Sequence, residues 1–193
     1  LGVTNVEFAT GDAYALDFPD GNFDVVHAHQ TLQHLADPVR ALREMCRVAK
    51  PGGVVAARDA DYGGMTWFPL LPGLSRWMDL YQAVHRSNGG EPDAGRHLRS
   101  WALQAGFGDV ACTASMWSYG SDEERRWWGG MWADRVTQSS FAAQAVALGV
   151  IDQTGLDALA ATWRDWSMAS DGWFGIPSTE ILFRKPSEQH PLR

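Results

Sequence analysis

The sequence predicts an α/β fold built on a sheet that contains parallel strands. Two short apolar segments, residues 23–28 and 54–57, flank an amphipathic segment with a helical period, and this order is typical of a parallel crossover unit. Further helical patterns are followed by two more strand patterns, at residues 110–116 and 179–184. Because 193 residues fall within the usual size of one domain, we expect a single globular unit.

The first expected elements are short strands separated by polar turns. Residues 5–9 (NVEFA) predict a strand, and the sequence Gly11-Asp12-Ala13 follows it. A polar turn at residues 19–22 leads into residues 23–28, which are apolar after Asp24. We expect this second strand to be buried.

The segment that follows carries clear signals for a helix. Asp37 is the expected N-cap, and Pro38 suits the first helical position, where its missing N–H leaves no hydrogen bond unmade. One face of this helix is apolar and comprises Val39, Leu42, Met45, Cys46 and Ala49. Pro51 ends the helix, and Gly52-Gly53 allow the chain to reverse into strand 54–57.

Two helices are expected between strand 54–57 and strand 110–116. The first helix has an apolar face made of Leu74, Trp77, Met78, Tyr81 and Val84, and it ends at Gly89-Gly90. The second spans about residues 94–105 and ends at Gly106. Alternating side chains at 110–116 then indicate a strand.

The last part of the chain predicts further helices and a final strand. Ser121 and Glu124 have the spacing of a capping box, which opens a tryptophan-rich helical stretch that continues to Leu148. Another helix covers about residues 154–168, and residues 179–184 form the last strand.

Composition excludes several classes of function. A net charge of −7 and a pI near 5.2 are unlike a surface that neutralises phosphates, so we expect no nucleic-acid partner. No apolar run approaches 18 residues, which predicts no membrane span and a soluble protein. Cys46 and Cys112 have no metal-binding spacing around them, and a reducing cytoplasm is the expected location.

Three motifs occur in an order and spacing that together are specific. They are GDA at residues 11–13, FDVVHAHQTLQHL at 23–35 and DPVRALREMCRVAKPGG at 37–53. With the two late strands, they make the chain resemble the class I S-adenosylmethionine-dependent methyltransferases of the small-molecule type, the methyltransferase type 11 or UbiE-like group. The resemblance covers the part of that domain that follows its glycine-rich motif.

This resemblance implies a Rossmann-like sheet in the order 3-2-1-4-5-7-6. Residues 6–9, 25–28, 54–57, 110–116 and 179–184 would then be strands three to seven, and strands one and two, with the glycine-rich turn, are expected upstream of residue 1. Residues 1–186 would be the C-terminal part of one methyltransferase domain, with substrate-side helical insertions at 65–108 and 117–175 and a tail at 187–193. The 193 residues alone are expected to be inactive and incompletely stable.

The resemblance also implies where S-adenosylmethionine binds. Asp12 matches the position whose carboxylate accepts a hydrogen bond from the adenine amino group, and the Ala13 amide would donate to a ring nitrogen. The alternative for Asp12 is that it only turns the chain. The backbone of Ala28, His29 and Gln30 would line the methionine part of the cofactor. Gln33 and His34 follow in the next turn.

Two histidine positions have competing interpretations. His27 and His29 project from the same side of a strand, as metal ligands can, but a third ligand is not evident and we predict no metal site. His34 matches a histidine of the family, where packing near the site is a more common role than that of a catalytic base.

A general base is optional for methyl transfer, because alignment with an activated sulfonium supplies much of the acceleration. Candidate bases near the end of strand 54–57 are Asp59, Asp61 and Tyr62, with His85 on the next helix; Asp61 and His85 are preferred. Arg96 either binds an acidic group of the substrate or caps local structure.

The acceptor is predicted to be a small molecule, which the aromatic residues suggest is aromatic or apolar. The chain has ten tryptophans, all of them after Met65. The aromatic residues of the two insertions are Trp67, Phe68, Trp77, Tyr81, Trp127, Trp128 and Trp132. They either line a pocket near the sulfonium or pack helices together.

Two other functions remain as alternatives. A nicotinamide-dependent dehydrogenase could use a related sheet, but no Tyr-x-x-x-Lys pair follows residues 23–28. A degenerate methyltransferase fold could serve as a binding or assembly module. The sequence indicates neither the methylated atom nor the oligomeric state.

Overall fold

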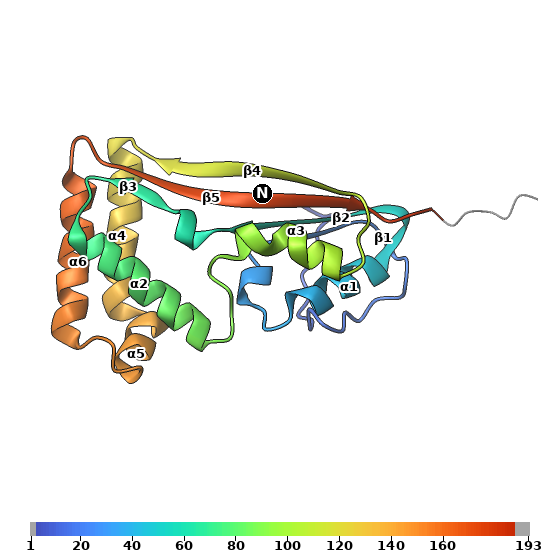
Figure 1. The fold of residues 1–193 in the computed structure, drawn as a ribbon, viewed down its shortest axis with the longest axis horizontal. Coiled ribbons are helices and arrows are strands. Elements are labelled where there is room, and N and C mark those ends of the chain that lie inside the picture. Colours follow the sequence, from blue (N-terminus) through green and yellow to red (C-terminus); the bar gives the residue numbers. More distant parts are fainter. Residues whose placement is uncertain (1–2, 188–193) are drawn as a thin grey trace, which may run out of the picture.

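The computed structural model describes residues 3–187, which form a mixed sheet with helices packed on one face and at one end (Figure 1). The sheet contains β1 (Phe23–His29), β2 (Ala49–Ala60), β5 (Trp173–Arg184) and β4 (Val110–Tyr119), in that spatial order. A short strand, β3 (Thr66–Phe68), pairs with the start of β5. Residues 188–193 of the predicted tail lie outside the described residues.

Strand direction and order agree with the expected sheet. β1 and β2 are parallel, with Ala28 opposite Ala57, and β5 runs antiparallel to both β2 and β4. The order β1-β2-β5-β4 is therefore the 4-5-7-6 part of the predicted sheet. β1 ends one residue beyond its predicted limit, whereas β2, β4 and β5 extend further because their ladders continue beyond the most apolar residues.

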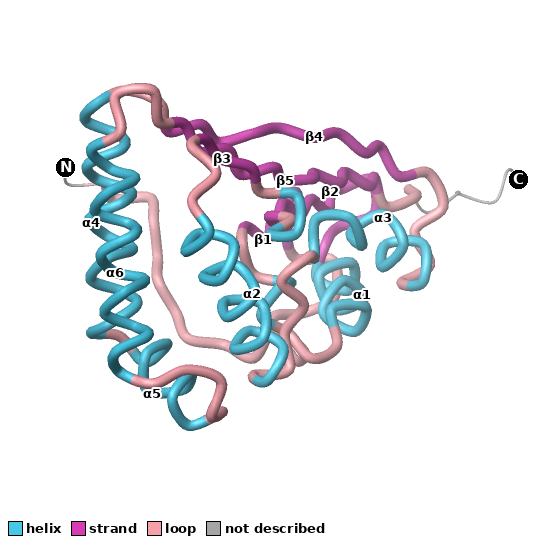
Figure 2. The backbone as a smooth tube through the Cα atoms, turned by 60° about the vertical axis from the view of Figure 1, so that its left-hand side comes forward, coloured by secondary structure: helices cyan, strands magenta, loops and turns pink. Residues whose placement is uncertain are grey.

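One face of the sheet is covered by α1 (Pro38–Val48) and α3 (Ala94–Gln104), as Figure 2 shows. The Asp37 side chain accepts a hydrogen bond from the Arg40 amide at 2.9 Å, which confirms the predicted N-cap. Leu42 of α1 and Leu98 of α3 are fully buried in a core that also contains Phe183 of β5.

The remaining helices form a separate layer at the end of the sheet where β5 begins (Figures 1 and 2). They are α2 (Pro72–Ser87), α4 (Asp122–Gln138), α5 (Ser140–Ala147) and α6 (Gln153–Met168). Ser139 separates α4 from α5, so the predicted tryptophan-rich stretch is two helices. The capping box is present at the start of α4.

The core of this layer is built largely from aromatic rings. Trp77 is fully buried and lies edge-on to Trp132 and Trp163, with ring centroids 4.6 and 4.8 Å apart. It also stacks on Tyr81 at 5.7 Å. Because these rings come from α2, α4 and α6, their packing determines how the helices sit against one another.

The structure corrects two predictions for the first part of the chain. Residues 5–9 form no strand, and Phe8 is 92% exposed; a strand needs a hydrogen-bonding neighbour, and residues 3–187 provide none there. β1 is not fully buried, since Val25 is 61% exposed. It is an edge strand, and one face of it is uncovered within the described residues.

Candidate active site

Polar side chains gather where β1 and β2 end on the same edge of the sheet. Gln30 follows β1, and Gln33 and His34 belong to the next single turn, η1 (Leu32–His34). Tyr62 belongs to a second such turn, η2 (Tyr62–Gly64), which comes just after β2, and His85 comes from α2. The carboxyl ends of parallel strands are where α/β folds place their ligands. We call these five residues the strand-end cluster.

Gln33 is at the centre of the cluster and is only 2% exposed. Its Nε2 lies 3.0 Å from Gln30 Oε1, 3.2 Å from His34 Nε2 and 3.4 Å from the Tyr62 hydroxyl. Gln33 Oε1 and Gln30 Nε2 are buried and have no hydrogen-bond partner among the described residues. A buried amide left unpaired is costly, so this acceptor and this donor are suited to a bound polar group.

The backbone at Gln30 has an unusual conformation. Its φ is +52°, in the left-handed region that side-chain-bearing residues seldom adopt, while its amide donates to the Arg58 carbonyl at 2.8 Å. The chain therefore turns sharply at the end of β1 and directs residues 31–34 across the end of β2. Sequence reasoning selected Gln30 from the resemblance, but no local signal indicated this turn.

Asp59 holds the η1 turn in place. Its side chain is fully buried at the end of β2, and Oδ1 accepts a hydrogen bond from the Gln33 amide at 3.2 Å. Burial raises the pKa of Asp59 to about 6, although the amides of residues 31–33 oppose this by favouring the carboxylate. We therefore interpret Asp59 as a residue that positions Gln33 and His34.

His34 and His85 stack with ring centroids 5.0 Å apart. His85 Nε2 lies 2.8 Å from the Gln33 carbonyl oxygen, which requires this nitrogen to carry the proton and to donate. Burial is the main cause that lowers the pKa of His34, and the charges of His85 and Arg135 add to it. The two rings line a cavity of about 50 Å³ with Asn88 and Gly90.

Tyr62 and Tyr81 close the cluster on the side of the helical layer. Their hydroxyls are 3.5 Å apart and their rings meet edge to face. Burial raises the pKa of Tyr62 far above its usual range, so its hydroxyl stays protonated. Tyr62 can donate a hydrogen bond, but it is poorly suited to act as a base.

Asp61 is engaged by other groups of the protein. Its two oxygens accept hydrogen bonds from Arg96 Nε and Nη2 at 2.6 and 2.5 Å, and Oδ1 also accepts from the Gly64 amide at 3.0 Å. This bidentate pair joins η2 to the start of α3, and it shows what Arg96 contacts. A role for Asp61 as a base would require the pair to open.

Asp12 and Ala13 lie in a loop before β1. Asp12 Oδ1 accepts a hydrogen bond from the Tyr14 amide at 2.8 Å, and Tyr14 in turn accepts one from the Asp37 amide through its hydroxyl at 3.0 Å. This loop therefore rests against the start of α1. Within residues 3–187 no hydrogen bond connects Asp12 or Ala13 with the strand-end cluster, and their place in the cofactor site stays a prediction.

The aromatic residues of the two insertions have different environments. Trp77, Trp128 and Trp132 are buried in the core of the helical layer, as the packing alternative predicted. Trp127 and Phe68, in contrast, are 59% and 51% exposed. Trp127 shares concave surfaces with neighbouring residues of α4 and β4, which we consider further below.

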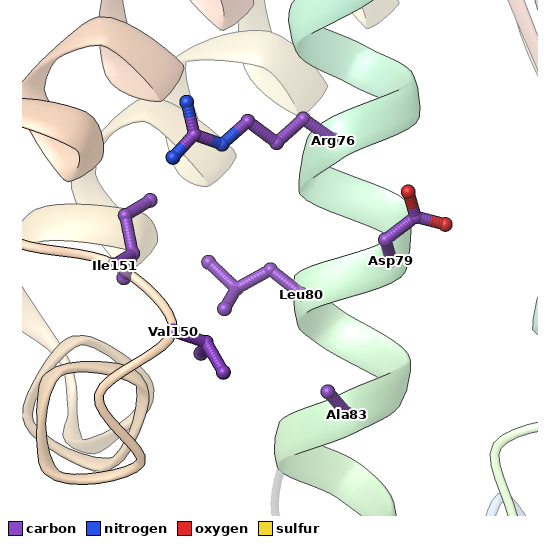
Figure 3. A pocket seen from close by; sticks show the side chains of 6 residues that line it. All are labelled: Arg76, Asp79, Leu80, Ala83, Val150 and Ile151. Carbon is purple, nitrogen blue, oxygen red and sulfur yellow. The ribbon is translucent and has the colours of Figure 1, made fainter.

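Two other hollows lie away from the strand-end cluster. One, of about 270 Å³, lies between α2 and the loop before α6; Leu80, Val150 and Ile151 line it, and Asp79 points away from its centre (Figure 3). The other, of about 320 Å³, lies on the uncovered sheet face and includes His27. None of the residues proposed for the cofactor or for catalysis lines either hollow.

His27 and His29 stack on the uncovered sheet face with ring centroids 6.1 Å apart. Within residues 3–187, no group of three histidine, cysteine, aspartate or glutamate side chains is placed to hold a metal ion. None of the helices described combines the length and apolar character that a membrane crossing needs.

Comparison with known proteins identifies the family. A family model for a methyltransferase domain matches residues 1–57. An uncharacterized methyltransferase of Schizosaccharomyces pombe is 34% identical over 185 residues, which cover 95% of this chain and 66% of that protein. The chain belongs to the class I methyltransferases. Its β1-β2-β5-β4 order is the family's arrangement, so the fold supports the same conclusion.

Other methyltransferases extend the comparison. The ubiquinone/menaquinone biosynthesis C-methyltransferase UbiE of Laribacter hongkongensis is 34% identical over 117 residues, which is 53% of this chain and 46% of that enzyme. A solved structure, a candidate methyltransferase from an antibiotic biosynthesis pathway of Anabaena variabilis, shares the fold with a TM-score of 0.55 at 14% identity. The alignment covers 93% of this chain and 74% of that one. The chain spans about two-thirds of the yeast relative and about half of UbiE.

Proposed function

We propose that the protein takes part in S-adenosylmethionine-dependent methyl transfer to a small-molecule acceptor. The observation that carries this proposal is the strand-end cluster, in which a buried acceptor, Gln33 Oε1, and a buried donor, Gln30 Nε2, both lack a partner among the described residues. They lie at the end of β1, where the family's cofactor binds. Free cysteines at 46 and 112 are compatible with a reducing cytoplasm.

The chemistry of these groups suits the methionine end of the cofactor. An ammonium group can donate to Gln33 Oε1, and a carboxylate can accept from Gln30 Nε2. When bound, S-adenosylmethionine supplies a methyl group already activated by a sulfonium. Gln30 and Gln33 would orient that end of the molecule, while Asp12 and Ala13 would recognise adenine from the loop before β1.

Of the two preferred bases, His85 is the one within the strand-end cluster. Its Nε2 donates to the Gln33 carbonyl, so Nδ1 is the nitrogen that can accept a proton. Asp61 is held by Arg96, which makes it the second choice. Neither is essential if the acceptor is already nucleophilic, because alignment then supplies much of the acceleration.

We further propose that residues 1–193 contribute only part of the complete cofactor site. The outer edge of β1 has no neighbouring strand among the described residues. Strands one and two and a glycine-rich turn, expected upstream, would fill this edge and hold the rest of the cofactor. The family assignment gives no support to a nicotinamide-dependent dehydrogenase.

Replacing Gln33 with leucine tests the role of the cluster. In a longer polypeptide with about 80 further residues before residue 1, enough for two βα units, we expect S-adenosylhomocysteine to bind with a micromolar dissociation constant. Gln33→Leu should weaken binding at least about 10-fold, because the amide contacts are lost. Isothermal titration calorimetry measures both, and Gln104→Leu, on exposed α3 surface, is the control. Equal affinities for all three proteins would remove Gln33 from the cofactor site.

A further inference from the structure

An exposed cleft lies along α4, outside the strand-end cluster. It has a volume of about 490 Å³ and is lined by Trp127, Met131, Asp134, Arg135, Gln138 and Ser139. Trp127 also lines an adjoining hollow of about 450 Å³ with Trp117 and Tyr119 of β4. We call the combined surface the Trp127 cleft.

The walls of the cleft are aromatic to an unusual degree for an exposed surface. Trp127 and Trp117 are 59% and 40% exposed, and the rings of Trp127 and Tyr119 are 5.9 Å apart. Contiguous exposed apolar surface of this kind often marks a place that contacts a ligand or a partner. The flat faces of these aromatic side chains suit a ring or another flat apolar group.

Arg135 gives the cleft a positive charge with which no acidic side chain among the described residues forms an ion pair. Its guanidinium lies 5.0 Å from the centre of the Trp132 ring, and it has no hydrogen-bond or ion-pair partner among residues 3–187. Arg125 and Arg126, on the same helix, both pair with Asp122. Asp134 also lines the cleft, but the two residues are adjacent in sequence and do not face each other along the helix.

Arg135 also lies near the strand-end cluster. Trp132, on which it rests, contacts Tyr81 with ring centroids 5.1 Å apart, and the hydroxyl of Tyr81 is 3.5 Å from that of Tyr62. The charge of Arg135 is close enough to contribute to the lowered pKa of His34. The Arg135 end of the cleft is therefore near the place where the reacting methyl group is proposed to lie.

We propose that the Trp127 cleft binds the methyl acceptor, and that this acceptor is an aromatic anion. Its ring packs on Trp127, and its carboxylate or another planar anionic group accepts hydrogen bonds from the Arg135 guanidinium. This inference rests on the proposed methyltransferase function, because it names the class of substrate for that reaction.

The test uses two probes of similar shape, 1-naphthoate and the uncharged 1-naphthylmethanol. In the longer polypeptide, the indole N–H signal of Trp127, identified by its loss in Trp127→Phe, is followed by NMR while each probe is added. We expect a saturable shift with 1-naphthoate. Arg135→Gln should weaken naphthoate binding at least about 10-fold and change naphthylmethanol binding less than about twofold. Arg126→Gln, on exposed surface of the same helix, should change neither.

The inference is overturned if 1-naphthoate leaves the Trp127 signal unmoved, or if Arg135→Gln binds it as the unsubstituted protein does. An equal loss of affinity for both probes in Arg135→Gln also overturns the inference, since the charge of Arg135 would then have no specific role. Cofactor binding is measured separately with S-adenosylhomocysteine. If the cofactor fails to bind while naphthoate still responds to Arg135, the cleft binds an aromatic anion but the proposed methyl transfer is wrong.

Discussion

Replacing Trp77 with alanine is expected to lower the free energy of unfolding by about 3–5 kcal/mol. Trp77 is fully buried, and its ring contacts Trp132, Trp163 and Tyr81 from three helices. Truncation removes the transfer energy of the ring and leaves a cavity that rigid aromatic neighbours cannot close. Urea denaturation of the longer polypeptide with about 80 further residues, followed by circular dichroism, measures the change.

The same substitution should disturb the strand-end cluster, because Tyr81 loses the ring on which it stacks. Trp127→Ala provides the control, since Trp127 is 59% exposed and should cost less than about 1 kcal/mol. If Trp77→Ala fails to fold, Trp77→Phe retains part of the packing and should still destabilise more than Trp127→Ala. A reversed order of the two effects would mean that the aromatic core does not hold the helical layer together.

The second large effect is a pH-dependent contribution of Asp59 to stability. Its pKa rises from an ordinary 3.8 to about 6 in the folded protein, mainly through burial. The folded state therefore binds this proton more tightly than the unfolded state does. The resulting stabilisation is complete below about pH 4 and is lost as the pH rises through 6, and a shift of this size corresponds to about 3 kcal/mol.

Asp59→Asn isolates this contribution because asparagine does not titrate. We expect the unfolding free energy of the unsubstituted protein, relative to Asp59→Asn, to fall by up to about 3 kcal/mol between pH 4 and pH 7. Asp24→Asn should show the opposite trend, since the contact with Lys50 lowers the pKa of Asp24. Urea titrations of the longer polypeptide at several pH values measure both. If this difference in unfolding free energy stays constant or increases with pH for Asp59, the account of Asp59 as a buried carboxyl with a raised pKa is wrong.

Local signals in the sequence predicted much of the fold. Asp37 with Pro38 predicted the start of α1, and Ser121 with Glu124 predicted that of α4, because capping depends on residues three positions apart. The neighbours of β2 and β5 in the sheet were predicted from the family resemblance. Residues 5–9 were predicted wrongly, because apolar alternation does not provide the partner strand that a ladder needs.

The candidate site was less predictable, since its contacts join distant segments. Gln33 was selected from the resemblance, but its position depends on Asp59, which lies 26 residues away in the sequence. Asp61 was a candidate base by its place after a strand, and only the fold brings Arg96 against it. Arg135 was not predicted to have a role, because helical spacing shows which residues share a face but not what lies opposite that face.

Binding of S-adenosylhomocysteine, mapped residue by residue by NMR, tests the central claim most directly. In the longer polypeptide with about 80 further residues, we expect micromolar binding with shifts at the amides of residues 12–13 and 28–34. Residues 1–193 alone should bind at least about 100-fold more weakly and lack a cooperative, monomeric thermal transition. Micromolar binding and a cooperative monomeric transition in residues 1–193 alone would contradict the proposed division of the cofactor site. Shifts confined to other segments would contradict the assignment of the strand-end cluster.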